Sequence, residues 1–188
     1  MMKSGQNPVD NDRNSRRLAA ALYPCEEWVV HGTNIYVAKS RLTGGHKEQA
    51  RLYREISDVR ILTDRGSTAY FLPEHPKEPE IGKKHADAVI DGAVVELKTI
   101  SGNRTTLGKS FKKGYKQGRS VLEAHPEIQA EHDVFLRLYT PFTIESVRAK
   151  IAGELKNTVD KGRCICYFEA AGELYYWAYD ELRAIVDT

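Results

Sequence analysis

The segment HADAVIDGAVVELKTI, residues 85–100, constrains the fold more than any other part of this chain. Two runs of alternating apolar and polar residues flank Asp91-Gly92, a dipeptide that favours a two-residue type I′ hairpin turn. A turn at these two residues places Asp87 opposite Glu96 on neighbouring strands. The sequence therefore predicts a β-hairpin whose register is fixed by its turn.

The predicted hairpin has two faces, because side chains alternate across a strand. One face is apolar and reads as ordinary core: Ala86, Ala88, Ile90, Ala93, Val95 and Leu97. The other face is charged away from the turn: His85 opposite Lys98, and Asp87 opposite Glu96, with Val89 and Val94 nearer the turn. Like charges directly opposite each other destabilise a strand pair. We therefore expect a bound cation between the two carboxylates, on a solvent-accessible face.

This pattern resembles the PD-(D/E)XK nuclease superfamily, in which an Asp and a Glu-x-Lys on adjacent strands hold a magnesium ion. Asp87 matches the family's Asp, and Glu96 and Lys98 match its Glu-x-Lys, whereas Ala86 stands where many members have proline. The resemblance implies that Asp87, Glu96 and the backbone carbonyl of Leu97 hold Mg²⁺ or Mn²⁺. It also implies that Lys98 orients the attacking water or offsets charge in the transition state.

The resemblance suggests further site residues outside the hairpin. Many members add an acid from the first core helix, where Glu48 and Glu55 lie seven residues apart on one stripe; we prefer Glu48, which is early in the helix. In several branches a Gln from the helix after Glu-x-Lys lines the site, and Gln117 matches it loosely, with Ser110 a weaker candidate. His85 is a candidate for substrate or outer-shell contact, although a partly exposed strand-end histidine is the plainer interpretation.

The net charge of +2 hides an uneven distribution of basic residues. No acidic residue occurs between Leu97 and Leu122, and seven basic ones do: Lys98, Arg104, Lys109, Lys112, Lys113, Lys116 and Arg119. Such a block is a candidate footprint for a phosphate backbone, and a solvated helix face is its alternative. Because it directly follows the hairpin, we interpret it as a nucleic-acid-binding surface.

The apolar periodicity predicts helices over 13–22, 45–57, 107–121, 143–158 and 180–186, with Thr43 as a candidate N-cap of the second. Beside the hairpin, we expect strands at 27–30, 34–38, 59–62, 68–72, 133–139, 163–168 and 174–177, and an extended loop over 73–84. The prediction is a mixed α/β protein (α+β with a mixed sheet). The element order resembles the αβββαβ, restriction-endonuclease-like core over about residues 43–140, with additions at 1–40 and 141–188.

Composition supports a single globular domain over 13–188, preceded by a mobile tail at 1–12. The chain has 188 residues, 41% hydrophobic and 29% charged, which suffices for one core. No apolar run approaches a membrane span, and the first residues lack a secretory h-region. We therefore expect a cytoplasmic protein with no membrane partner; a homodimer or a larger parent polypeptide is compatible with the sequence. Cys164 and Cys166 alternate in a strand-like run and are interpreted as core residues.

Two other functions stay open at this point. The pattern ADxxIDGxxxELK is also similar to domains at the C-termini of bacterial contact-dependent toxins and phage head proteins. Some of those are barnase-like or colicin-like ribonucleases, which cut RNA without metal; His31, His46 or His85 would then carry protons. A non-catalytic nuclease-fold module, with an ionic cluster at the hairpin, is the other alternative. We find no G-x-S-x-G, P-loop or paired metal-finger cysteines. The sequence does not separate DNA from RNA as the substrate.

Overall fold

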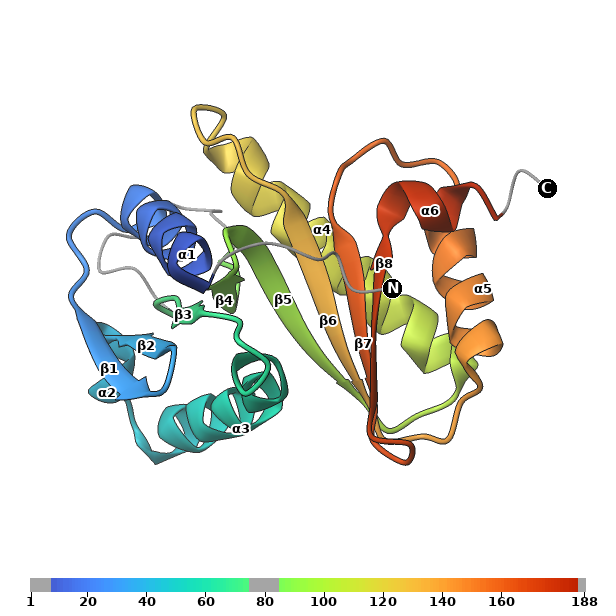
Figure 1. The fold of residues 1–188 in the computed structure, drawn as a ribbon, viewed down its shortest axis with the longest axis horizontal. Helices are drawn as coiled ribbons and strands as arrows, with labels where there is room; N and C mark the ends of the chain where they lie inside the picture. The colour runs from blue at the N-terminus through green and yellow to red at the C-terminus, as the bar shows by residue number, and fades with distance from the viewer. Residues whose placement is uncertain (1–7, 75–84, 186–188) are drawn as a thin grey trace.

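One mixed sheet of eight strands runs through the molecule, and its strands lie side by side in chain order (Figure 1). The computed structural model describes residues 8–74 and 85–185. The strands are β1 (Trp28–Gly32), β2 (Ile35–Ala38), β3 (Ala69–Phe71), β4 (Ala88–Ile90), β5 (Ala93–Ile100), β6 (His132–Leu138), β7 (Arg163–Phe168) and β8 (Glu173–Ala178). The helices are α1 (Pro8–Leu22), α2 (Lys39–Leu42), α3 (His46–Thr63), α4 (Arg104–Ala124), α5 (Ile144–Leu155) and α6 (Tyr179–Arg183). The predicted mixed α/β class is confirmed.

The strand directions follow from the connections. Strands β3, β4 and β5 form an antiparallel meander, whereas β5, β6 and β7 are parallel and are joined by crossover helices α4 and α5. Parallel neighbours need such long crossovers, while antiparallel ones need only short turns. The segment from α3 to β6 thus reads helix, three strands, helix, strand. Outer pairs β1–β2 and β7–β8 are antiparallel.

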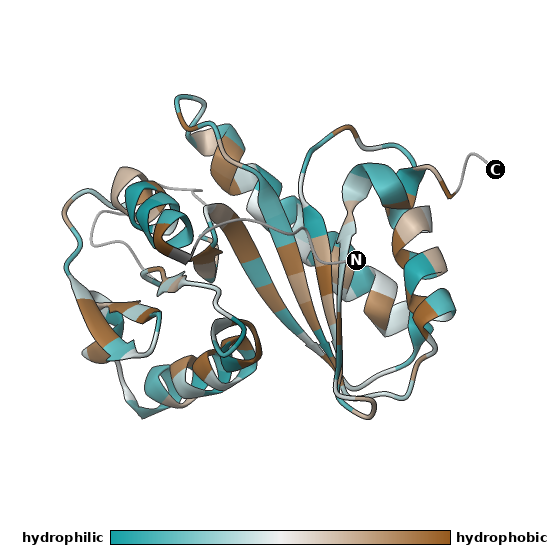
Figure 2. Ribbon diagram, in the orientation of Figure 1, coloured by the Kyte–Doolittle hydropathy of each residue, from teal (hydrophilic) through white to brown (hydrophobic). Residues whose placement is uncertain are grey.

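Helices cover the two faces of the sheet unequally. Helix α3 packs one face through Leu52, Ile56 and Val59, against residues of β2 to β7. Helices α1, α4, α5 and α6 pack the opposite face in two clusters. Figure 2 shows hydrophobic and hydrophilic residues alternating along β5, as expected for a strand with differently used faces. None of the helices in the described ranges is long and apolar enough to cross a membrane.

The hairpin forms with the predicted turn and register. Asp91 and Gly92 both have positive φ, 49° and 80°, as a type I′ turn requires. Ile90 pairs with Ala93, and the pairing ends at Ala88 opposite Val95. The turn is held from outside because the Asp91 carboxylate accepts a hydrogen bond from the Thr68 N–H at 2.9 Å. The register on which the site depends is therefore confirmed up to Ala88.

Two glycines let α4 lie close to the sheet. A Cβ at Gly114 would lie 3.2 Å from Val134 Cγ1 and 3.3 Å from Lys98 Cε, and one at Gly118 would lie 3.1 Å from His132 Cβ. These separations are at or below ordinary van der Waals contact, so larger residues would push the helix away. Each glycine lowers the helix propensity by about 1 kcal/mol relative to alanine, and the close packing of α4 on the sheet offsets this cost. Glycine therefore brings α4 directly over the Glu-x-Lys strand.

Several predicted boundaries were wrong. Residues 59–62 are the end of α3, not a strand, because Leu52, Ile56, Val59 and Leu62 are all buried at helical spacing. That helix starts after Gly45, not Thr43; the Glu48 carboxylate accepts a hydrogen bond from the Gly45 N–H at 3.0 Å.

The first helix also starts earlier than predicted. Helix α1 begins at Pro8, not at residue 13, and Asp12 within it accepts a hydrogen bond from the Tyr70 hydroxyl at 3.0 Å. Proline is favoured at the first helical position, so residues 8–12 belong to the folded part and not to a tail. Residues 1–7, and 75–84 of the expected loop, lie outside the described residues. Cys164 and Cys166 are buried, as their interpretation as core residues predicted.

Candidate functional site

Asp87 lies where the pairing of β4 with β5 stops. The residue directly precedes β4, and its carboxylate Oδ2 accepts a hydrogen bond from the Leu97 N–H at 2.8 Å. In an antiparallel pair, the N–H and C=O of such a residue point to the same neighbour. The Leu97 carbonyl therefore faces the same edge of β5 as the Asp87 carboxylate. Asp87 and the Leu97 backbone come together as the sequence predicted.

Glu96 and Lys98 complete the predicted triplet. Lys98 Nζ lies 2.8 Å from Glu96 Oε2 and 3.8 Å from Asp87 Oδ2. Their accessibility differs from the expectation of an open face: the Glu96 side chain is 0% exposed, Asp87 13% and Lys98 18%. The reason is the close approach of α4, because even a Cβ added to Gly114 would lie 3.4 Å from Glu96 Cβ. The cluster is thus assembled but opens to solvent only past Asp87 and Lys98.

The surroundings of Glu96 disfavour its ionised form. Burial and, after it, the Asp87 charge raise the pKa of its carboxyl, and because Lys98 only partly opposes them the pKa reaches about 8. Its Oε1 is buried and has no hydrogen-bond partner among the described residues. A buried acceptor without a partner costs about 1–3 kcal/mol, more when charged. Lys98 therefore satisfies Glu96 Oε2, while Oε1 has neither a donor nor a cation beside it within the described residues.

Gln117 lies on the same side of α4 as the site. It follows Gly114 by one helical turn, and a Cβ on Gly114 would contact both Glu96 and Lys98. Like Glu96 Oε1, Gln117 Oε1 is buried with no partner within the part of the chain that the structure describes. Two unsatisfied acceptors therefore occur along one seam between α4 and the sheet. The weaker candidate Ser110 is half-buried, one turn before Gly114.

The donor set fits magnesium or manganese. Mg²⁺ keeps several waters and takes one or two carboxylates, and Asp87, Glu96 and the Leu97 carbonyl offer two carboxylates and one neutral oxygen. Within residues 8–74 and 85–185, no group of three or more His, Cys, Asp or Glu side chains is placed to hold a metal. Two carboxylates and one carbonyl are fewer protein ligands than the four of a structural zinc site, and they match the small set that a hydrated Mg²⁺ takes.

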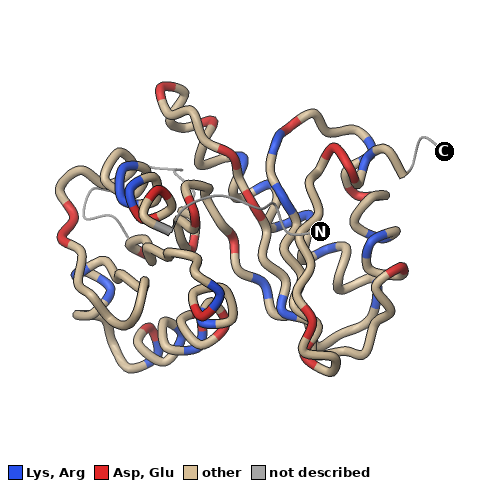
Figure 3. The backbone as a smooth tube through the Cα atoms, in the orientation of Figure 1, with Lys and Arg blue, Asp and Glu red and all other residues tan. Residues whose placement is uncertain are grey.

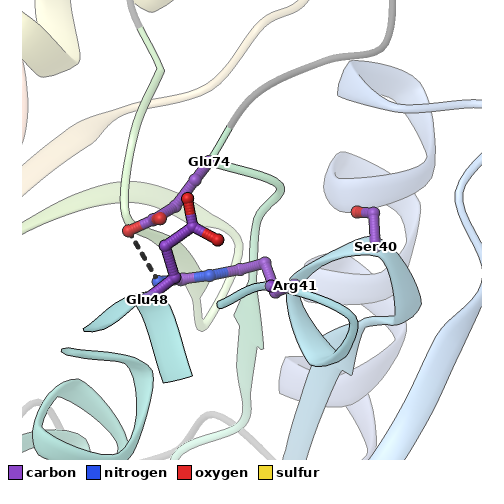
Figure 4. Close-up of a pocket in the computed structure, with 5 residues that line it drawn as sticks. Ser40, Arg41, Glu48 and Glu74 are labelled. Carbon is purple, nitrogen blue, oxygen red and sulfur yellow. Dashed lines mark hydrogen bonds and ion pairs between the residues drawn. The ribbon is translucent and has the colours of Figure 1, made fainter. Parts of the chain in front are cut away.

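The helical acid nearest the site is Glu55 and not the preferred Glu48. Glu55 is buried, and burial followed by the Asp87 charge raises the pKa of its carboxyl against the nearby arginines. Glu48 instead caps the first turn of α3 and lines a pocket of about 70 Å³ with Ser40, Arg41, Gly44 and Glu74 (Figure 4). The seven-residue spacing places both acids on one stripe, but only Glu55 is far enough along α3 to lie near Asp87.

Two arginines that the sequence did not single out pair with Glu55, and one of them, Arg51, also reaches Asp87. Arg41 lies 2.9 Å from Glu55 Oε2, and Arg51 lies 2.8 Å from Glu55 Oε1 and 3.4 Å from Asp87 Oδ1. The i, i+4 spacing of Arg51 and Glu55 was a visible signal. Arg41 and Glu74 come from distant segments, so no local sequence pattern indicated their contacts. Figure 4 shows Arg41 and Glu74 pointing toward each other, at 3.3 Å.

His85 does not lie opposite Lys98. The strand pairing ends at Ala88, so the predicted pair is not formed. His85 Nδ1 instead lies 3.1 Å from the hydroxyl of Tyr23. Burial raises the pKa of that tyrosine to about 12, so its hydroxyl stays protonated at neutral pH. His85 is thus placed against α1's end and not over the carboxylate pair.

The basic block lies on α4 as predicted. Its lysines and arginines at 104, 109, 112, 113, 116 and 119 are exposed. Lys112 lies 4.0 Å from Glu154, and Arg119 pairs with Glu123 at 2.7 Å. Lys109, Lys113 and Lys116 follow helical spacing on the flank that also carries Gln117. Figure 3 shows acidic and basic residues interspersed elsewhere along the chain, so the block is a local feature.

Comparison of this chain with protein-family models, curated proteins and solved structures found no match.

Proposed function

We propose that this protein is a metal-dependent nuclease of the PD-(D/E)XK type, which hydrolyses phosphodiester bonds of DNA or RNA with Mg²⁺ or Mn²⁺. One observation carries the proposal: Asp87 and Glu96 meet around Lys98, and a buried oxygen of Glu96 has no partner in the described residues. A divalent cation would satisfy that oxygen and offset the repulsion between the carboxylates. The helix, three strands, helix, strand order from α3 to β6 supports the same family.

Each residue has a role that follows from its contacts. Asp87, Glu96 and the Leu97 carbonyl hold the ion, which when bound polarises the phosphate and acidifies a water. Lys98 has three N–H donors, of which one meets Glu96, so others can orient the attacking water or meet developing charge. Gln117 offers a side-chain amide beside the pair. The exposed lysines of α4 supply sequence-independent attraction for a phosphate backbone.

A purely structural ionic cluster explains the geometry less well. A structural cluster gains stability only when each buried charge is fully paired and hydrogen-bonded. Glu96 is buried with a raised pKa, and one of its oxygens has no partner in the described part of the chain, which costs stability. Strongly perturbed acids of this kind concentrate at functional sites. The metal-independent ribonuclease is also less supported, because its histidines lie apart: His31 in β1, His46 starting α3, and His85 beside Tyr23.

Cleavage of nucleic acid tests the proposal. We expect supercoiled plasmid or tRNA to be cut in Mg²⁺ or Mn²⁺, and EDTA to abolish cutting. Asp87→Asn should lower the rate at least about 10²-fold, because it removes a charged ligand of the ion. Glu48→Gln, at the start of α3 and away from Asp87, should leave the rate within about twofold. Gel electrophoresis of the products measures the cleavage rates of both variants.

Two outcomes would count against this function. EDTA-resistant RNA cleavage that leaves 2′,3′-cyclic phosphates assigns the chain to the metal-independent ribonucleases. Absence of cleavage of every DNA and RNA tested, in either ion, favours the non-catalytic module. The cytoplasm as the place of action stays a prediction of the sequence.

A further inference from the structure

Arg51 of α3 contacts three acids from three parts of the chain. Its Nε lies 2.8 Å from Glu55 on the same helix, its Nη1 lies 3.1 Å from Glu74 after β3, and its Nη2 lies 3.4 Å from Asp87 before β4. Despite these contacts its side chain is 55% exposed. The guanidinium is therefore fixed in direction by three carboxylates, while the side chain stays half-exposed.

Stability alone does not account for Arg51. Arg41 already pairs with Glu55 and Glu74, at 2.9 and 3.3 Å, and its side chain is only 3% exposed. Arg41 is thus the buried counter-ion of these acids. Ion pairs of an exposed side chain contribute little to stability, so the half-exposed Arg51 adds less to folding than Arg41 does, although it also reaches Asp87.

The donors of Arg51 leave room for a ligand. A guanidinium has five N–H groups in a planar fork. Each nitrogen meets one carboxylate, so each terminal nitrogen keeps a second N–H that has no acceptor among the described residues. Arginine uses such a fork to bind phosphate through two parallel hydrogen bonds. A guanidinium that is already oriented loses little freedom on binding.

The charges around the site also favour an anion once a divalent ion is present. Four carboxylates, Glu55, Glu74, Asp87 and Glu96, face three cations, Arg41, Arg51 and Lys98. With all four carboxylates ionised and no metal bound, this group would have one negative charge in excess. A divalent ion on Asp87 and Glu96 leaves one positive charge in excess, which matches the single charge of a phosphodiester.

We propose that Arg51 is a substrate-binding residue that contacts a backbone phosphate of the nucleic acid beside the Asp87–Glu96 pair. This inference rests on the proposed nuclease function. It assigns to α3 a phosphate contact that is separate from the basic block of α4. Because Arg51 touches Asp87, the phosphate that it binds lies next to the bond that is cut.

Oligonucleotide binding by variants of Arg51 tests the inference. Fluorescence anisotropy with a short fluorescein-labelled oligonucleotide, DNA and RNA in turn, is measured in Mg²⁺ and in a Lys98→Ala background that keeps both carboxylates. Arg51→Gln should raise Kd about 10- to 100-fold, as expected for loss of one charge-assisted contact, and should reduce the salt slope by about one unit. The Kd of Arg51→Lys should lie between those of the parent and Arg51→Gln, because lysine keeps the positive charge but lacks the planar fork of N–H donors. Arg54→Gln, whose side chain bonds only its own helix carbonyl at Ala50 in the described structure, should leave Kd unchanged.

The outcomes separate this inference from the proposed function. If the parent protein cleaves nucleic acid but Arg51→Gln binds oligonucleotide normally and Mn²⁺ more tightly, Arg51 is only a counter-ion of the acids and the inference is wrong. A lower kcat with unchanged Kd also overturns it. If the parent protein neither binds nor cleaves, the proposed function fails and this inference with it. Thermal melts show whether Arg51→Gln is folded; if it is not, Arg51→Lys decides.

Discussion

Glu96→Gln is expected to make the metal-free protein more stable at pH 8, and to abolish metal-dependent cleavage. Burial and the Asp87 charge raise the pKa of Glu96 from 4.5 to about 8. The protonated carboxyl therefore contributes stability that is fully present below about pH 4.5 and is lost as pH rises through about 8. Glutamine resembles the protonated form and does not titrate. The expected gain at pH 8 is roughly 2–4 kcal/mol, from about 1.4 kcal/mol per pKa unit.

Urea melts in EDTA at pH 5 and pH 8 measure this effect. The free energies of unfolding of the parent protein and Glu96→Gln should be similar at pH 5 and should separate at pH 8. Glu48→Gln, which keeps its capping geometry, should show no such separation. A Glu96→Gln protein that is less stable than the parent at pH 8 would mean that the Lys98–Glu96 pair stabilises the fold. The claim that the buried Glu96 carboxylate lowers stability because it serves a metal site would then be wrong.

Lys98→Ala is expected to lower kcat about 10²- to 10⁴-fold while metal binding is kept. Lys98 is the cation between the two carboxylates, 2.8 Å from Glu96 and 3.8 Å from Asp87. Its loss removes the donor to the attacking water or to developing charge, an effect of this order in other enzymes. Removal of a competing positive charge should leave Mn²⁺ affinity equal or tighter.

Steady-state cleavage and Mn²⁺ titration of one preparation test both halves of this prediction. Lys116→Ala, an exposed lysine of the basic block on α4, serves as the control. It should raise KM only modestly, because it removes one phosphate contact and leaves the carboxylate pair unchanged. Equal loss of kcat in the two variants would show that Lys98 acts as one more surface cation.

The hairpin was predictable because its determinants are local. Asp91-Gly92 fixes the turn, and the two-residue alternation fixes which side chains share a face. By contrast, it is the structure that shows Gly114 and Gly118 to bring α4 close to the sheet. Local signals thus placed Glu96 and Lys98 side by side before the structure was known.

The errors came from contacts that local patterns do not encode. Residues 59–62 have strand-like composition, but the helical spacing that begins at Leu52 continues through them and prevails. Glu55 takes the place of Glu48 because its position depends on how α3 lies against the sheet. Arg41 and Glu74 meet Arg51 across distant segments, and the burial of Glu96 follows from the closeness of α4.

Calorimetric titration of the metal-free protein with Mn²⁺ tests the central claim most directly, because it needs no knowledge of the substrate. We predict saturable binding of about one ion per chain, which releases protons at pH 7 because Glu96 must ionise to bind. Asp87→Asn and Glu96→Gln should each abolish that binding, and Glu48→Gln should preserve it. If the parent protein takes up no Mn²⁺, or if the Asp87 and Glu96 variants bind it as tightly as the parent does, then these carboxylates do not form a metal site.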